Sequence, residues 1–322
     1  MSSAQGPDSN NLTEEGSCYF IANKMSETDF EPFLYYFITA LVVTRVITFL
    51  IDWRQLMKYK EATPDPYLAD DFNKQEFEDS QKYQYEKHSF KIVHSAFDLF
   101  TDLCFWLLFV WVWIWNRVDY IMSSLALCSD TPYINDITQA VLFAACLLLI
   151  ESVMNLPFSI YDTFVIEENY GFNKTTKGTF IKDEIKKLVL LILLFAVLIP
   201  LLLWIIEKTG EAMIPALAGV CIFGIVLINL LIPTVILPIF FTFSELEDED
   251  LRNKIYAEAE KTKINVDEIR VIDGSQRSSH SNAFVAGLCG ARKVVVFDTL
   301  LEQHSEEEIL AVVNHELGHV AH

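Results

Sequence analysis

Basic residues are scarce in this chain of 322 residues. The sequence holds 24 Lys and Arg against 44 Asp and Glu, which gives a formal net charge of −20 at pH 7. Such an acidic chain repels the phosphates of nucleic acid, and the same deficit argues against a strong anchor on anionic lipid. We expect the surplus carboxylates to lie in solvated loops.

Cysteine is also scarce, and the six cysteines include no C-x-x-C pair. The sequence therefore gives no sign of a C-x-x-C metal or redox site. Cys104, Cys146 and Cys221 fall within apolar runs, where a thiol packs as a small apolar side chain. A cleavable signal is missing too, because residues 1–32 are polar and acidic, so the first apolar run is expected to insert directly.

Apolar residues, by contrast, make up 52% of the chain, and the mean hydropathy is positive. That composition is too apolar for an ordinary soluble domain of this length. Five runs approach or exceed the roughly 20 residues that cross a bilayer. They cover residues 33–51, 97–115, 137–156, 188–206 and 213–241. Pro215, Pro233 and Pro238 are expected to kink or end the last run.

Lys and Arg beside the spans predict the orientation, because positive residues stay on the cytosolic side. Arg54, Lys58 and Lys60 follow the first span, and five lysines lie between the third and fourth spans. The chain is therefore predicted to have three parts. They are a lumenal tail at 1–32, a transmembrane region at 33–243 and a cytosolic domain at 244–322.

This orientation has consequences for modification. It makes Asn11 a usable glycosylation site and leaves the sequon at Asn173 silent in the cytosol. Cys18 and Cys128 would both be lumenal, where they could pair or remain structural thiols.

Several spans carry polar side chains of a kind that rarely face lipid. They are Arg45, Asp98, Asp102, Glu151, Asn155 and Asn229. One interpretation is a hydrated cavity enclosed by the spans. The alternative places Asp98, Asp102 and Asn155 at span ends near headgroups, and pairs Arg45 with Glu151 inside the bundle.

The soluble domain begins at Ser244 with a charged stretch, which is followed by a helix around 251–262. Strand-like runs at 269–272, 282–285 and 293–297 predict a small β-sheet.

One of these strands is a candidate substrate-binding segment. An extended peptide can pair with the edge strand of a sheet, and Asn282, Ala283 and Phe284 are the candidates here. A buried structural strand is the alternative for the same residues.

The final segment contains an H-E-x-x-H motif from His315 to His319. Positions i and i+4 share one face of an α-helix, so His315 and His319 are predicted to ligate one Zn²⁺ ion. Zinc lowers the pKa of a bound water, and Glu316 can take its proton as general base. The alternative is an ordinary amphipathic helix with two solvated histidines.

The sequence also specifies the helix that carries the motif. Ser305 and Glu308 form a capping box at its start. An apolar stripe faces away from the histidines. It consists of Ile309, Val313, Leu317 and Val320.

A catalytic zinc site normally has three protein ligands, and the motif supplies two. His322 shares the face of the pair but lies roughly 10 Å along the helix axis from His315, too far to close on one ion. His280 and His304 are upstream candidates, whereas the commoner arrangement takes a Glu or His after the motif. We therefore expect the third ligand beyond residue 322, and expect the chain as given to bind zinc weakly and to be inactive.

Several blocks in one order closely resemble the zinc-dependent CAAX prenyl protease family, from about residue 33 to the end. The blocks are Asp52–Gln55, Leu156–Ser159, Phe164–Glu168, Gly171–Lys174, Arg277–Phe284, Val296–Leu301 and His315–His319. Val320 stands where the family usually has Trp.

The resemblance implies a seven-span protein of the endoplasmic reticulum and inner nuclear membrane, five spans of which lie here, with a water-filled chamber capped by a zinc domain. It implies removal of the last three residues from farnesylated C-a-a-X proteins, and a second upstream cut in prelamin-like or pheromone-like precursors. His315 and His319 would be zinc ligands, Glu316 the base, and Asn282 and Ala283 part of the substrate-pairing strand.

Two other functions stay open on the sequence. One is a non-catalytic membrane protein that keeps the chamber and binds prenylated chains or partner proteins. The other is a membrane quality-control zinc protease without prenyl preference. The oligomeric state and the natural substrates are not indicated by the sequence.

Overall fold

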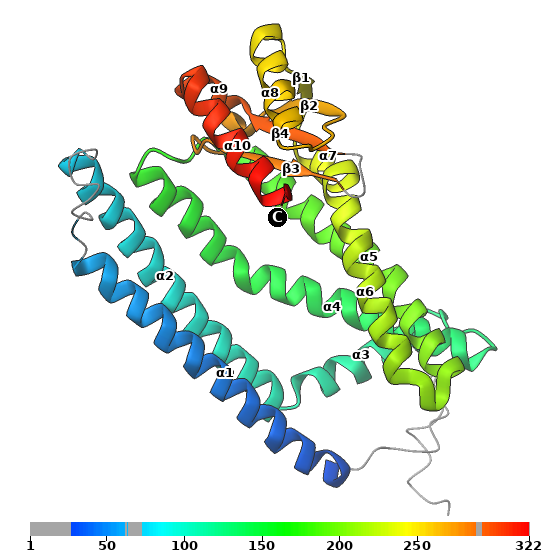
Figure 1. Cartoon of the computed structure of the whole chain (residues 1–322). Coiled ribbons are helices and arrows are strands. Elements are labelled where there is room, and N and C mark those ends of the chain that lie inside the picture. Colours follow the sequence, from blue (N-terminus) through cyan, green and yellow to red (C-terminus); the bar gives the residue numbers. More distant parts are fainter. Residues whose placement is uncertain (1–26, 62, 64–72, 288–291, 322) are drawn as a thin grey trace, which may run out of the picture. The chain divides into compact units, whose positions relative to one another are not determined.

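The computed structural model describes residues 27–61, 63, 73–287 and 292–321 (Figure 1). These residues form long α-helices and a four-stranded sheet, which confirms the predicted mainly helical fold with a small sheet. Asn11, Cys18 and His322, which carry three of the predictions above, lie outside the described residues.

The chain divides into two compact units. The first holds the residues up to Asp162 together with Ile192–Leu203, and the second holds Thr163–Leu191 with Trp204–His322. The helices of the first unit are α1 (Glu27–Glu61), α2 (Lys74–Leu107), α3 (Val110–Ser124) and α4 (Pro132–Tyr161). Helix α1 packs along α2, and α3 packs along α4.

A sharp bend separates α2 from α3. The two helices meet at 64° across residues 108 and 109, and Phe109 takes a left-handed conformation with φ of 52°. The predicted span at 97–115 straddles this bend, so the structure divides that run between two helices. A left-handed residue cannot continue an α-helix, which explains the break.

Long apolar helices account for the other predicted spans. Among the described residues, four segments have the length and composition to cross a membrane, and the bent pair makes up to five. The four are Leu34–Lys60, Pro132–Glu167, Lys177–Thr209 and Met213–Phe240. The second of them extends α4 through a π-helical segment, η1 (Asp162–Glu167), and the third is α5.

The last apolar segment contains the three prolines. It comprises α6 (Met213–Leu231), a π-helical segment η3 (Ile232–Ile236) and α7 (Leu237–Phe240). Pro215 lies in the first turn of α6, where its missing N–H leaves no helical hydrogen bond unmade. Pro233 lies inside η3, so the wider turn accommodates the lost donor, and the helix ends two residues after Pro238.

The cysteines fall into two groups. Cys104, Cys146 and Cys221 are free thiols, of which the first two are half-buried and Cys221 is exposed. Cys128 is disulfide-bonded.

The sheet belongs to the second unit and has the order β1-β2-β4-β3. Its strands are β1 (Phe243–Glu245), β2 (Glu268–Ile272), β3 (Ala283–Ala286) and β4 (Lys293–Phe297). The central β2–β4 pair is parallel and places Val271 beside Val296, while the outer pairs are antiparallel. Strand β1 was not predicted.

Helices follow the strands in this part of the chain. They are α8 (Glu249–Lys261), α9 (Asp298–Gln303) and α10 (Glu306–Ala321), with a 3-10 turn, η4 (Gly274–Gln276), after β2. Asp248 caps α8 by accepting hydrogen bonds from the N–H groups of Asp250 and Leu251. Gly274 is required in the turn, because a Cβ there would collide with the Phe297 ring.

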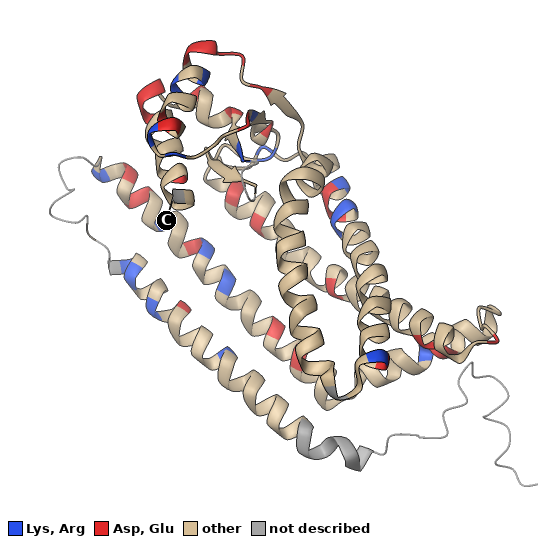
Figure 2. Cartoon of the chain, turned by 45° about the vertical axis from the view of Figure 1, so that its right-hand side comes forward, with Lys and Arg blue, Asp and Glu red and all other residues tan. Residues whose placement is uncertain are grey.

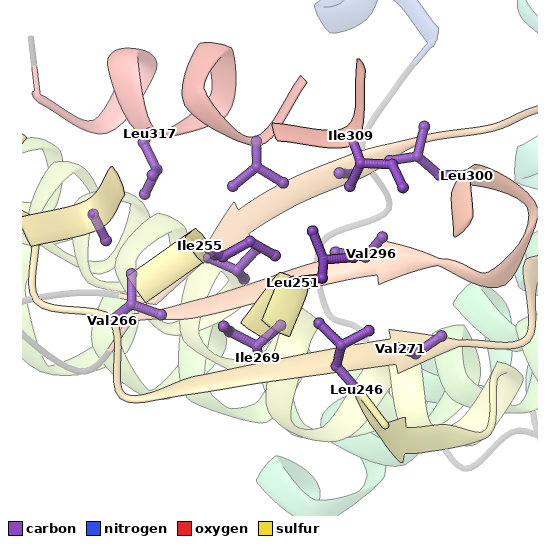
Figure 3. Packing of buried hydrophobic residues seen from close by; sticks show 14 of the residues in the cluster. Leu246, Leu251, Ile255, Val266, Ile269, Val271, Val296, Leu300, Ile309 and Leu317 are labelled. Atoms are coloured by element: carbon purple, nitrogen blue, oxygen red, sulfur yellow. The ribbon is translucent and has the colours of Figure 1, made fainter. Parts of the chain in front are cut away.

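A single apolar core joins α8, α10 and one face of the sheet (Figure 3). Alternate residues of the two central strands enter this core, including Ile269 and Val271 from β2 and Val296 from β4. Ile255 of α8 is completely buried between the sheet and the helices. The core therefore holds α10, the helix of the H-E-x-x-H motif, in a fixed position against the sheet.

This packing predicts the effect of shortening one buried side chain of α8. Ile255→Ala should lower the free energy of unfolding of this domain by about 2–5 kcal/mol, because a fully buried side chain leaves a cavity. Tyr256→Ala, at the next and 37% exposed position, serves as control and should cost much less. Urea unfolding of the whole protein, followed by pulse proteolysis within residues 244–322, measures the unfolding free energy of both variants. Equal losses would contradict the packing.

Candidate metal centre

Helix α10 begins with one half of the predicted capping box, in which the Glu308 carboxylate reaches back to Ser305. The Ser305 backbone N–H donates to Glu308 Oε2 at 2.8 Å, and Ser305 Oγ donates to the same oxygen at 2.9 Å. The first helical hydrogen bond follows, from Ile309 N to Ser305 O at 3.0 Å. The start of the motif helix is therefore fixed by local interactions before any tertiary contact is made.

The predicted apolar stripe faces the core. Val313 and Leu317 have no exposed surface, Ile309 is buried, and Val320 packs against the same cluster. Because His315 and His319 lie on either side of Leu317 in sequence, burial of Leu317 turns both imidazoles away from the sheet. Both histidines are exposed.

The two imidazoles converge. Their Nε2 atoms lie 3.0 Å apart, and the ring planes are nearly perpendicular, at 89°. Tetrahedral zinc with Zn–N bonds of about 2.0–2.1 Å separates two nitrogen ligands by about 3.3 Å, so the observed spacing fits one shared ion.

Glu316 completes a compact group with the histidines. One ligand atom from each of the three residues lies within 4.8 Å of the others, and this is the only such group among the described residues. The Glu316 side chain is half-buried. A carboxylate beside the two nitrogens can accept a proton from a water that approaches the same ion.

His280 and His304 do not join this group. His280 lies 3.5 Å from Glu167 and stacks on Phe172. His304 Nε2 contacts Ser281 Oγ at 3.1 Å, and its Nδ1 faces Glu308. Neither upstream candidate therefore supplies a third ligand in this arrangement.

Strand β3 lies at an edge of the sheet and next to α10. Phe297 N donates to Asn282 O at 3.0 Å, which makes Asn282 and Phe297 a hydrogen-bonded pair. Pairs alternate along an antiparallel ladder, so the backbone groups of Ala283 and Val285 point to the open edge. Asn282 is exposed, Ala283 is buried, and the ring of Phe284 lies edge-on to that of Phe297.

Sequence reasoning missed the support for this strand. Arg277, six residues before β3, pairs with Asp183 of α5 through Nε at 2.8 Å and Nη2 at 3.2 Å. Its backbone oxygen accepts from Lys174 N and Thr175 Oγ1, each at 3.0 Å. The 171–175 loop and the N-terminal part of α5 thus hold the segment that leads into the candidate substrate strand.

The polar residues of the first unit also come together. Arg45 pairs with Asp102 at 2.9 Å, rather than with Glu151 as one interpretation had it. His94 lies between Asn155 at 2.8 Å and Asp98 at 3.6 Å. Arg45, Asp98, Asp102, Glu151 and Asn155 all line one cavity of about 290 Å³. The polar side chains of these spans thus gather around a cavity within the first unit.

Two family models match consecutive parts of this chain. A family model described as CAAX prenyl protease N-terminal, five membrane helices, matches residues 53–242, and a model of peptidase family M48 matches residues 245–322. The CAAX prenyl protease 1 homolog of Arabidopsis thaliana is 33% identical over 290 residues, which cover 89% of this chain and 67% of the plant protein.

Two further relatives agree with this match. CAAX prenyl protease 1 of Saccharomyces cerevisiae is 33% identical over 270 residues, covering 84% of this chain and 59% of the yeast protein. The crystal structure of S. mikatae Ste24p is similar with a TM-score of 0.78 and 32% identity, covering 89% of this chain and 67% of that structure. The chain thus spans about two thirds of the length of the plant protein and of the solved structure.

The capping box predicts a pH dependence. The two Ser305 hydrogen bonds, with the nearby His304, hold the pKa of Glu308 below its ordinary value of 4.5. A carboxylate with a depressed pKa stabilises the fold above pH 4.5, and this contribution is lost as the pH falls through the folded-state pKa. Glu308→Gln should therefore lower the thermal midpoint at neutral pH, and the difference from wild type should shrink on acidification. A constant difference across the titration would contradict this cap.

Proposed function

This chain belongs to the CAAX prenyl protease family within the M48 metallopeptidases, and on that premise we propose that it is an integral-membrane zinc endoprotease that removes the -aaX tripeptide from farnesylated C-a-a-X proteins. A second, upstream cleavage in prelamin-like or pheromone-like precursors is part of the same proposal. The observation that carries it is the pair of Nε2 atoms 3.0 Å apart, with Glu316 beside them and an open strand edge next to their helix.

His315 and His319 would hold one zinc ion through their Nε2 atoms. The third ligand is proposed to be a Glu or His from a segment that follows the motif, since neither His280 nor His304 belongs to the group. Zinc in this position would lower the pKa of a coordinated water and polarise the scissile carbonyl.

Glu316 acts as the proton carrier of the reaction. It accepts a proton from the attacking water as the new C–O bond forms, and it returns that proton to the amine when the C–N bond breaks. Because Glu316 is adjacent to His315 on the motif helix, the packing of α10 also sets its position. The same carboxylate therefore serves both proton transfers.

Strand β3 would bind the substrate as an added strand. The outward backbone groups of Ala283 and Val285 are placed to pair with an extended peptide. The N–H of Ala283 donates to Asn282 Oδ1 at 2.8 Å. A substrate carbonyl would accept from the Ala283 N–H in place of Asn282 Oδ1. Substrate binding would therefore release the Asn282 side chain from this hydrogen bond.

Two substitutions test the assignment of the motif. Glu316→Gln should abolish cleavage of a farnesylated C-a-a-X peptide and leave zinc bound, because it removes the base and keeps both imidazoles. His315→Ala should lose both zinc and turnover. Zinc content and peptide cleavage are measured in detergent on a protein that includes the segment proposed to supply the third ligand. Turnover by Glu316→Gln near the wild-type rate would rule out its role as base.

We propose that the protein resides in the endoplasmic reticulum membrane, extending to the inner nuclear membrane, with the zinc domain in the cytosol. The lysines between the third and fourth spans support this orientation. It gives farnesylated cytosolic proteins access to the open edge of β3.

Glycosylation in microsomes tests this orientation, and Asn11 should be modified while Asn173 is not. Asn173 is held by Glu168 and Thr175, so its silence alone could reflect packing. Glu260→Asn, at an exposed position of α8, creates a sequon with Thr262 and should also stay silent in the cytosol. Modification at residue 260, with Asn11 unmodified, would place the zinc domain in the lumen.

A further inference from the structure

A cluster of lysines marks the start of α5. Residues 174–187 contain five lysines and two acidic residues, a local excess of three positive charges in a chain whose net charge is −20. The lysines are Lys174, Lys177, Lys182, Lys186 and Lys187. Figure 2 shows this basic end of α5, beyond which the helix is almost free of charge until its other end.

The two acidic residues of this segment are already engaged. Asp183 pairs with Arg277, and Glu184 pairs with Lys187 at 2.9 Å. Lys186 donates to the backbone oxygen of Ile239 at 2.7 Å, which uses one of its three donors. Lys182 has no carboxylate partner within the described part of the chain. Cationic donors therefore remain available here.

Lys182 and Lys186 line a polar cavity of about 270 Å³ together with Arg277, Gln276, Asp183 and Asp273. Asp183 is paired with Arg277, whereas Asp273 accepts only from the neutral donors Thr242 N and Gln276 Nε2, each at 2.7 Å, so three cations and two carboxylates give the lining a net charge of +1. One guanidinium nitrogen of Arg277, Nη1, is buried and has no acceptor among the described residues. The ammonium groups of Lys182 and Lys186 are thus the donors that an oxyanion in this cavity would meet.

The cavity lies where two apolar helices end. The apolar part of α5 begins directly after Lys187, and the apolar segment that contains α7 ends at Phe240, another lining residue. Ile181, Ile185 and Val189 on α5 are each about half exposed or more, at 57%, 57% and 48%. A ligand with a phosphate and acyl chains could occupy the cavity and cover these side chains together.

We propose that this cavity binds the phosphate group of an anionic phospholipid, with Lys182 and Lys186 as its ligands. Basic residues just outside a span attract acidic headgroups, and each lysine near the surface contributes about fivefold in affinity. Orientation of the spans requires lysines near the helix end, but it does not require them around a cavity. The site holds a single lipid, while the spans keep the chain in the bilayer.

Lipid binding by the intact protein tests this assignment without any measurement of proteolysis. The protein is placed in phosphatidylcholine nanodiscs with or without phosphatidylserine, and its thermal midpoint and the phosphatidylserine retained in native mass spectrometry are recorded. Phosphatidylserine should raise the midpoint and remain bound. Lys182→Gln removes a side chain without an ion-pair partner and should weaken retention about fivefold.

Lys58→Gln is the matched control, because Lys58 is exposed in the last turn of α1 and does not line this cavity. It should leave retention unchanged. Equal effects of Lys182→Gln and Lys58→Gln would show only general surface attraction and would overturn the proposal. Inorganic phosphate added to discs of phosphatidylcholine alone should not raise the midpoint, and an equal rise would assign the cavity to free phosphate instead of lipid.

Discussion

The packing of helix α10 against the sheet fixes the direction in which the motif histidines point. Val313 and Leu317 are completely buried, so α10 cannot rotate about its axis without opening the core. His315 and His319 are about one helical turn apart, so they share one face of α10 and their imidazoles converge. The same core holds β3 beside α10, which means that the candidate metal centre and the candidate substrate strand share one rigid support.

Much of this arrangement could be predicted because it depends on short-range patterns. The capping box requires residues three apart, and the metal pair requires residues four apart, so Ser305, Glu308, His315 and His319 could be assigned from spacing alone. The three predicted strands were recognisable as short strand-like runs separated by glycines, and their bounds and those of α8 were predicted to within two residues. Span composition likewise identified the long helices, since apolar content over about 20 residues is a strong signal.

The remaining features depend on conformation or on distant partners. Nothing in the hydropathy of residues 97–115 shows that Phe109 adopts a positive φ and bends the run. Strand β1 has three residues and ends at Glu245, so its pairing with β2 shows no alternating pattern. Arg277 and Asp183 are 94 residues apart, and a single sequence gives no information on which acid an arginine will meet.

The most direct test of the account is the position of the metal itself. Diffraction from crystals of the zinc-loaded intact protein, recorded at the zinc absorption edge, locates the ion independently of activity. The account predicts one anomalous peak about 2.0–2.1 Å from Nε2 of both His315 and His319. A peak bound to only one of the two histidines, or to residues away from α10, would contradict it.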